Sequence, residues 1–312
     1  MARPVVIISG SVREALFAQP LVRALEGGAS VFAPRHSLDV FHLHTVGHGF
    51  AIRPGVGLVG AWRRLRTLPS TLVVVPPPVA ASTVALAYLS GIQKRVGIAG
   101  RGDWWTTEAV PVAAGLHPVD AIARLAARIA PGVASPGGPQ LQPAEVRRER
   151  LEARLRAAGI GAHDRVLVAI PGGGDWVHRG PRTRWPAERF AVLVNQLRPD
   201  LLVVVRGVGD ERPARELLAG VPLRTAVVDL SAILPEDLAT LAQRSLLVIG
   251  HDGDALHAAA AGGGRTLALL GPGDVEPYGP DGAAVRVAAL EKMPAREAVE
   301  AAHRHLGLAA HA

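Results

Sequence analysis

The 312-residue sequence contains no cysteine, which excludes disulfide bonds, thiolate nucleophiles and zinc sites built on cysteine. Aromatic residues make up only 4% of the chain. No helix-turn-helix, zinc-finger or aromatic-basic ribonucleoprotein motif occurs, so nucleic acid is disfavoured as a partner. Residues 1–11 lack the long apolar core of a signal peptide and begin like a buried strand. The sequence therefore predicts a globular, cytoplasmic protein.

Long uninterrupted apolar helices are also missing. Residues 72–92 carry no charge and are long enough to suggest a membrane span. However, Pro76, Pro77 and Pro78 remove three backbone donors and would break such a helix early. We expect instead a strand that ends at Val75, a proline loop, and a small-residue helix over residues 79–90.

What the sequence does have is an ordinary globular composition, 49% hydrophobic and 20% charged, with a net charge of +7. A basic balance suits an anionic partner such as a phosphorylated substrate or an acidic membrane surface. Many soluble proteins carry a similar charge without such a partner, so this alternative stays open.

Short β-branched runs alternate with Ala/Leu-rich segments of helical periodicity, which predicts parallel sheets covered on both faces. Residues 131–143 are rich in proline and glycine and are predicted to form a linker. The fold class is therefore α/β, with two Rossmann-like domains, 1–140 and 141–312, facing each other across a cleft. The last helix could pack on either domain. The expected strands are 5–8, 30–33, 72–75, 165–170, 201–205, 225–229, 246–249 and 266–270. The expected helices include 15–26, 119–129, 144–158, 187–197, 235–243 and 295–306.

The most informative stretch is residues 246–272. An apolar run ends at a turn with Asp252, Gly253 and Asp254, and a small-residue helix with His257 in its first turn follows. A helix N-terminus has unpaired N–H groups and a partial positive charge, so this turn favours phosphate. We interpret His257 as a phosphate contact, with a packed, hydrogen-bonded histidine as the alternative.

A second polar turn spans residues 171–186. Glycines at its start would let the backbone approach a ligand closely. Guanidinium groups beside such a turn suit a diphosphate, whereas a solvated basic loop is the structural alternative. The turn contains Gly172, Gly173, Gly174, His178, Arg179, Arg182 and Arg184, before a helix that starts near Trp185-Pro186.

Two carboxylates follow other predicted strands. Glu211 could bind ribose hydroxyls, or could simply favour the first turn of a helix. Glu14 lies where the first strand meets the first helix and could act as a general base, although glutamate there also suits the helix dipole. No metal site is predicted, because the remaining histidines are scattered. His42, His44 and His48 are expected in loops.

Together, these motifs resemble the heptosyltransferase family, the ADP-heptose:lipopolysaccharide transferases of glycosyltransferase family 9 with a GT-B fold. The similarity covers nearly the whole chain. In the first domain it rests on residues 19–25 and 87–97. In the second domain it rests on Gly172–Gly174, the run ending Arg184-Trp185-Pro186, Gly207 to Glu211, Asp252 to His257, and Gly271-Pro272.

The resemblance implies an inverting transferase that uses an ADP-sugar or other nucleotide-sugar and needs no metal or further cofactor. It assigns the acceptor to domain 1–140, with Glu14 as the base, and the nucleotide-sugar to domain 141–312. Positive charge on the leaving diphosphate would assist the reaction. The implied donor-binding residues are Gly172, Gly173, Arg182, Thr183, Arg184, Glu211, Asp252, Gly253, Asp254 and His257.

The sequence departs from the family pattern at three places. The family's Gly-Asp pair falls on Arg13-Glu14, and the extra methylene moves the carboxylate by roughly an ångström. The family's lysine falls on Thr183, so a neighbouring arginine would replace it. The family's Ser/Thr-Gly pair becomes Gly253-Asp254, which puts a negative charge near the diphosphate unless Asp254 turns away as an N-cap.

The leading hypothesis is a cytoplasmic glycosyltransferase that moves a sugar, a heptose by resemblance, to a lipopolysaccharide core or similar anionic glycolipid. Peripheral contact with the inner membrane would accompany this activity. The alternative, motivated by the three departures, is a catalytically degenerate nucleotide-binding or interaction protein of the same fold. A sugar-nucleotide epimerase of that fold is a third hypothesis.

Overall fold

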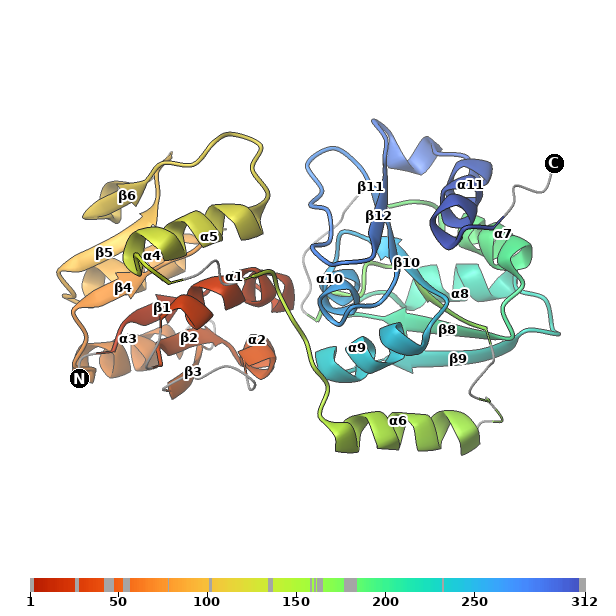
Figure 1. Ribbon diagram of the computed structural model, residues 1–312, viewed down its shortest axis with the longest axis horizontal. Coiled ribbons are helices and arrows are strands. Elements are labelled where there is room, and N and C mark those ends of the chain that lie inside the picture. Colours follow the sequence, from red (N-terminus) through yellow and green to blue (C-terminus); the bar gives the residue numbers. More distant parts are fainter. Residues whose placement is uncertain are drawn as a thin grey trace. The chain divides into compact units, whose positions relative to one another are not determined.

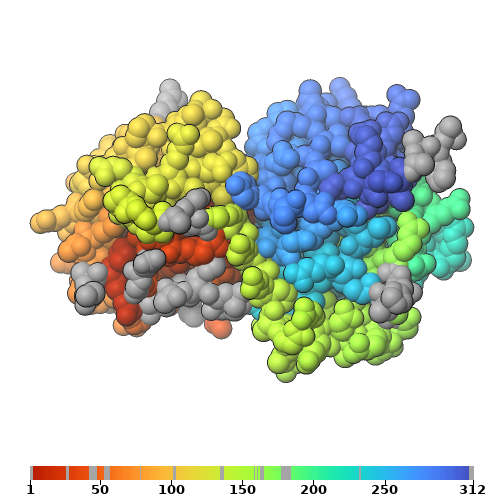
Figure 2. All heavy atoms as spheres, in the orientation of Figure 1, coloured from red at the N-terminus to blue at the C-terminus, as the bar shows by residue number. Residues whose placement is uncertain are grey.

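The computed structural model describes residues 3–25, 28–41, 48–52, 57–77, 79–100, 103–133, 137–157, 159, 161, 165–176, 184–231 and 233–308. The chain divides into two compact units, Met1–Pro139 and Gln140–Ala312. Figures 1 and 2 show unit 1 from red to yellow-green and unit 2 from there to blue. Each unit contains one six-stranded sheet in which all strand pairs are parallel. The predicted α/β fold with two Rossmann-like domains is confirmed.

Unit 1 has the strand order β3-β2-β1-β4-β5-β6. Helix α1 packs against α5, and α3 packs against α4. The α3–α4 layer buries Ala61, Leu65 and Leu86 against the sheet, together with Trp105. The strands are β1 (Val5–Ile7), β2 (Ser30–Pro34), β3 (His48–Ile52), β4 (Leu72–Val74), β5 (Lys94–Ile98) and β6 (Glu108–Val110). The helices are α1 (Val12–Ala24), α2 (Arg35–Leu38), η1 (Asp39–Phe41), α3 (Gly57–Thr67), α4 (Ala81–Leu89), η2 (Asp103–Trp105) and α5 (Pro118–Ile129).

Unit 2 has the strand order β12-β11-β10-β7-β8-β9, and its central strands β7, β10 and β11 are buried throughout. The strands are β7 (Val166–Ile170), β8 (Leu201–Arg206), β9 (Ala226–Ser231), β10 (Leu247–His251), β11 (Thr266–Leu270) and β12 (Gly282–Arg286). The helices are α6 (Glu145–Ala157), α7 (Ala187–Leu197), α8 (Glu211–Ala219), α9 (Pro235–Arg244), α10 (Asp254–Ala261), η3 (Leu290–Lys292) and α11 (Ala295–Leu306).

Two helices of unit 2 have partners that the sequence left open. Helix α11 packs on α7 and on strands β11 and β12, so it belongs to unit 2. The charged helix α6 packs on α9 (Figure 1), where Arg147 forms ion pairs with Glu236 at 2.5 Å and with Asp237 at 3.4 Å.

The predicted strands and helices all form, with ends shifted by a few residues. Strands β3, β5, β6 and β12 and helices α2 and α3 were not predicted. Strand β3 lies at a sheet edge with largely exposed side chains, and β5 starts with Lys94 and Arg95, so neither has the continuous apolar run of a central strand. The expectation that His48 lies in a loop was wrong, because it begins β3. His42 and His44 lie outside the described residues.

The uncharged stretch is divided between β4 (Leu72–Val74) and α4 (Ala81–Leu89), as the prolines predicted. Among the described residues, no helix has both the length and the apolar character to cross a membrane.

Candidate functional site

Three turns of unit 2 meet at the carboxyl ends of β7, β8 and β10: residues 171–176, 207–210 and 252–254. We call them the loop cluster. A Cβ atom added to Gly253 would overlap the carbonyl oxygen of Gly173, and one added to Gly207 would overlap the backbone of Asp175. Backbone therefore packs directly on backbone, which only glycine permits at these positions. The cluster lies at the strand ends where open α/β sheets bind ligands.

The Asp210 carboxylate joins the first two turns. Its Oδ2 accepts hydrogen bonds from the N–H groups of Gly174 and Gly207, both at 2.9 Å. Its Oδ1 accepts one from Nη1 of Arg184 at 3.1 Å. Asp210 is 1% exposed, and the space it fills is the space that a side chain at Gly172 would need. Asp210 thus fixes both the glycine turn and the nearest described arginine.

Asp175 and Asp254 join the first and third turns reciprocally. The N–H of Asp254 donates to Oδ1 of Asp175 at 3.0 Å, and the N–H of Trp176 donates to Oδ2 of Asp254 at 3.2 Å. The N-cap residue of α10 is Gly253, so an N-cap role for Asp254 was wrong. Asp254 is fully buried in the first helical turn, and its carboxylate binds the glycine turn.

His257 pairs with Asp252 through Nε2 and Oδ1, 2.8 Å apart, and both residues are buried. Oδ2 of Asp252 accepts a hydrogen bond from the N–H of Val275 at 3.1 Å. Asp252 therefore connects α10 with the turn after β11. His257 is thus packed and hydrogen-bonded, with its Nε2 paired with a carboxylate. This arrangement is the one given above as the alternative to a phosphate contact.

Arg184 is the described part of the predicted basic loop. Its side chain is 25% exposed and lies beside Gly173. The next residue, Trp185, donates its backbone N–H to Nε2 of His251 at 2.9 Å, which ties the start of α7 to the end of β10. Arg182 and Thr183 lie outside the described residues, as do His178 and Arg179.

Glu211 is exposed in the first turn of α8, directly after Asp210. Nearby, the Arg206 guanidinium donates to Asp229 at 2.6 Å, and this hydrogen bond raises the pKa of Arg206. The charges of Asp229, Glu211 and Asp210 act in the same direction. Glu211 therefore lies at the exposed rim of the loop cluster, near the Arg206 guanidinium.

In unit 1, Glu14 lies at the third position of α1 and is 3% exposed. Its Oε2 accepts hydrogen bonds from the N–H and the Oγ of Ser11, both at 2.7 Å, in a capping box. Its Oε1 accepts from Nη2 of Arg13 at 2.9 Å. A side chain at Gly10 would overlap this carboxylate. The carboxylate thus lies at the end of β1, held by three neighbouring groups.

Asp175, Asp210 and His251 were not predicted as site residues. Their positions in the sequence could have indicated Asp175 and Asp210, because Asp175 follows the three glycines and Asp210 directly precedes Glu211 after a strand. Their contacts also change the expected electrostatics. The N–H groups of Gly174 and Asp254, which a phosphate could use, donate to carboxylates instead. No cluster of three or more metal-ligating side chains occurs in the described part of the chain.

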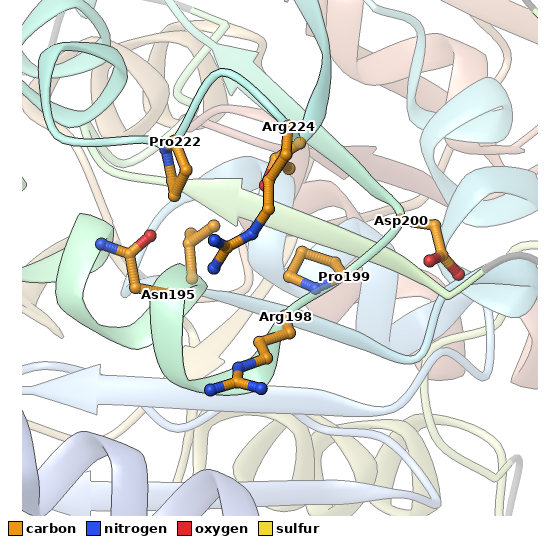
Figure 3. A pocket seen from close by; sticks show the side chains of 8 residues that line it. Asn195, Arg198, Pro199, Asp200, Pro222 and Arg224 are labelled. Atoms are coloured by element: carbon orange, nitrogen blue, oxygen red, sulfur yellow. The ribbon is translucent and has the colours of Figure 1, made fainter.

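A cavity of about 250 Å³ lies elsewhere in unit 2 (Figure 3). It is lined by Asn195 and Arg198 at the end of α7, and by Asp200 and Arg224, which precede β8 and β9. These are the amino ends of the strands. The cavity is therefore at the opposite edge of the sheet from the loop cluster.

The close packing of the cluster makes a direct prediction for Gly253→Ala. The new methyl group meets backbone atoms of Gly173 that cannot rotate away, so unit 2 should lose roughly 2–3 kcal/mol of stability. Gly60→Ala is the matched control, because nothing lies within 4 Å of its Cβ position and it is inside α3. That variant should gain up to about 1 kcal/mol. Urea unfolding measures both, and equal stabilities would contradict the packing.

Comparison with known proteins agrees with this architecture. Among curated proteins no sequence matches. The solved glycosyltransferase family 9 protein of Veillonella parvula superposes with a TM-score of 0.80 at 16% identity, covering 98% of this chain and 97% of that one. The E. coli ADP-heptose lipopolysaccharide heptosyltransferase II gives a TM-score of 0.74 at 20% identity, covering 97% and 98%. E. coli heptosyltransferase WaaC with ADP-2-deoxy-2-fluoro heptose gives 0.67 at 16% identity, covering 95% and 98%.

These likenesses confirm the GT-B fold. The sequence model of glycosyltransferase family 9 (heptosyltransferase) matches residues 62–305, which span most of both units. The family and the fold are those of a sugar-transfer enzyme, and the chain belongs to glycosyltransferase family 9.

Proposed function

We propose that this protein transfers a sugar, most simply a heptose, from a nucleotide-diphosphate donor to a lipopolysaccharide core or similar anionic glycan. The family match over both units carries the proposal. The ADP-2-deoxy-2-fluoro heptose bound to the structurally similar WaaC supports an ADP-sugar as the donor. The acceptor would be met at the cytoplasmic face of the inner membrane.

The donor is assigned to the loop cluster in unit 2. Its turns lie at the strand ends that bind ligands in open α/β sheets, with Arg184 beside Gly173. Arg184 would stabilise the diphosphate, assisted by Arg182 and Thr183 from the same loop. Gly172 and Gly173 would provide the close backbone approach, and Glu211 would bind the ribose. Asp252, Gly253, Asp254 and His257 would shape the phosphate end, the two aspartates acting through the hydrogen bonds they accept from Val275 and Trp176.

The acceptor is assigned to unit 1, with Glu14 as the general base. Its carboxylate would take the proton of the acceptor hydroxyl as that oxygen attacks the anomeric carbon. The bond from that carbon to the diphosphate oxygen breaks, and the electron pair leaves with the diphosphate. Attack opposite the leaving group inverts the configuration. Neither step requires a metal ion.

Calorimetry with ADP, UDP and GDP tests the donor site first. We expect ADP to bind most tightly, and Arg184→Ala to weaken it by about 1.5–3 kcal/mol, the value of a hydrogen bond to a charged group. A transfer assay with ADP-heptose and a lipopolysaccharide-core acceptor then tests catalysis. Release of ADP only when the acceptor is present would support the transferase.

One observation favours the inactive alternative. Buried carboxylates accept hydrogen bonds from the N–H groups of Gly174 and Asp254, so these donors already have partners before a ligand binds. A nucleotide-binding or interaction protein would bind ADP without turnover on any acceptor. An absence of nucleotide binding would contradict both functions.

A further inference from the structure

The charges of unit 1 are distributed unevenly along the chain. Between Asp39 and Asp103 the sequence has seven arginine and lysine residues and no aspartate or glutamate. Helices α3 and α4 both fall in this stretch and pack against one another. On α3, Ala61 and Leu65 are buried, whereas Arg63, Arg64 and Arg66 are exposed. The outer surface of this layer is therefore cationic.

Exposed apolar side chains gather on the same layer. The large hydrophobic residues that are exposed in unit 1 all come from α3, α4, η2 or the segment just before α4, as far as the structure describes that unit. They are Val59 (48% exposed), Val79 (44%), Tyr88 (51%), Leu89 (60%) and Trp104 (70%). We call these residues, with Arg63, Arg66, Lys94 and Arg95, the α3–α4 face. It lies outside the catalytic residues assigned above.

Side-chain contacts join the parts of this face. The rings of Tyr88 and Trp104 are 5.6 Å apart, and the Arg95 guanidinium lies 5.5 Å from the Tyr88 ring. Both aromatic side chains line a cavity of about 480 Å³, together with Val79 and Leu89. Asp103 lies at its edge, and Lys94 forms an ion pair with Glu108 at 3.4 Å, so the four cations of the face outnumber these two acids.

The face continues onto α3. Nε1 of Trp62 donates to the carbonyl oxygen of Leu89 at 2.8 Å, and the Arg66 guanidinium lies 5.2 Å from the Trp62 ring. Arg66 and Lys94 line a common cavity. Aromatic, aliphatic and cationic groups therefore form one surface.

We propose that unit 1 docks on an anionic lipid bilayer through the α3–α4 face. Tryptophan and tyrosine prefer the boundary between headgroups and acyl chains, where an apolar ring meets a wet edge. Arginine and lysine beside them bind anionic headgroups. Charge complementarity favours an anionic bilayer, because a face on which cations outnumber acids repels cationic surfaces and attracts a negatively charged leaflet. The inference rests on the proposed function, which puts the acceptor at a membrane, and goes further by naming the surface that meets the lipid.

Vesicle co-sedimentation of the full chain tests the proposal. We expect binding to vesicles that contain phosphatidylglycerol in phosphatidylcholine, and little binding to phosphatidylcholine alone. The double variant Arg63→Ser/Arg66→Ser should bind more weakly by about fivefold for each cation removed. Trp104→Ser should also weaken binding, whereas Trp104→Phe should retain most of it.

Matched controls come from unit 2. Arg150→Ser/Arg154→Ser removes two exposed cations from α6, and Leu223→Ser removes a fully exposed leucine. Both should bind like the parent protein. Brominated lipids should quench tryptophan fluorescence less in Trp104→Phe than in the parent at equal bound fraction.

Equal binding by the parent and the α3–α4 face variants would overturn the proposal, as would an absence of binding to anionic vesicles. Sedimentation without vesicles tests whether a second copy of this chain binds the face instead. Self-association that the same variants abolish, without vesicle binding, would make the face an interface between copies. Nucleotide calorimetry on the same samples separates either failure from a failure of the proposed transferase.

Discussion

Asp210→Ala is expected to lower the free energy of unfolding by about 3 kcal/mol. The carboxylate is 1% exposed and accepts hydrogen bonds from two backbone N–H groups and from Arg184. Alanine leaves those donors without their partner in a site too tight for easy rearrangement, and breaking a buried pair of this kind costs roughly 3–5 kcal/mol. The lower end applies because Arg184 is 25% exposed and keeps some water. Urea unfolding measures the loss.

Asp229→Ala is the matched control. Asp229 also pairs with an arginine, at 2.6 Å, but its side chain is 37% exposed, so its loss should cost under about 1 kcal/mol. Asp210→Asn should fall between the two, because the amide keeps an acceptor oxygen and loses the charge. If Asp210→Ala matched the Asp229 variant in stability, the loop cluster would not depend on this carboxylate. ADP affinity should fall with stability, because the same carboxylate holds Arg184 beside Gly173.

Glu14→Gln is expected to reduce kcat by roughly 10²–10⁴, the usual contribution of a general base. Nucleotide affinity should not change, because Glu14 is in unit 1 and the proposed donor site is in unit 2. Glutamine suits the third position of a capping box as well as glutamate does, so α1 should keep its N-terminus. The variant therefore removes basicity while it preserves the fold, and steady-state kinetics with calorimetry measures both effects.

Glu188→Gln is the control for this substitution, since Glu188 also lies in the first turn of a helix, α7, but is exposed. It should behave like the parent. Unchanged turnover in Glu14→Gln would show that Glu14 is not the general base and serves only in the capping box. A loss of turnover accompanied by a loss of stability would also contradict the general-base role, because the lower rate would then reflect a smaller folded fraction.

The sequence predicted the segments in which local pattern and tertiary environment agree. Strand β11 and helices α7 and α11 have the predicted bounds, because a continuous apolar run or a 3.6-residue period fits their burial. The edge strands β3 and β12 were missed. The side chains of β3 are largely exposed and those of β12 are at most half-buried, so neither strand has the continuous buried apolar run of a central strand.

Within the candidate site, the turns were found and their internal contacts were not. Glycines after a strand mark a close approach, but the sequence does not show what approaches them. Asp210 and Asp175 act across 36 and 79 residues of chain, through hydrogen bonds to Gly174 and Asp254. Such pairings depend on the strand order, which places β7 between β8 and β10. The N-cap alternative for Asp254 was wrong for this reason.

The contact between Gly253 and the Gly173 carbonyl limits how this protein can be redesigned. A different turn grafted after β10 would collide with the turn after β7. A different turn after β7 would lose the hydrogen bond that the Asp210 carboxylate accepts from Gly174. We therefore expect that exchanging one of these turns alone does not alter the donor preference. A chimera should exchange the segments 171–176, 207–210 and 252–254 as a single cassette, taken from one relative.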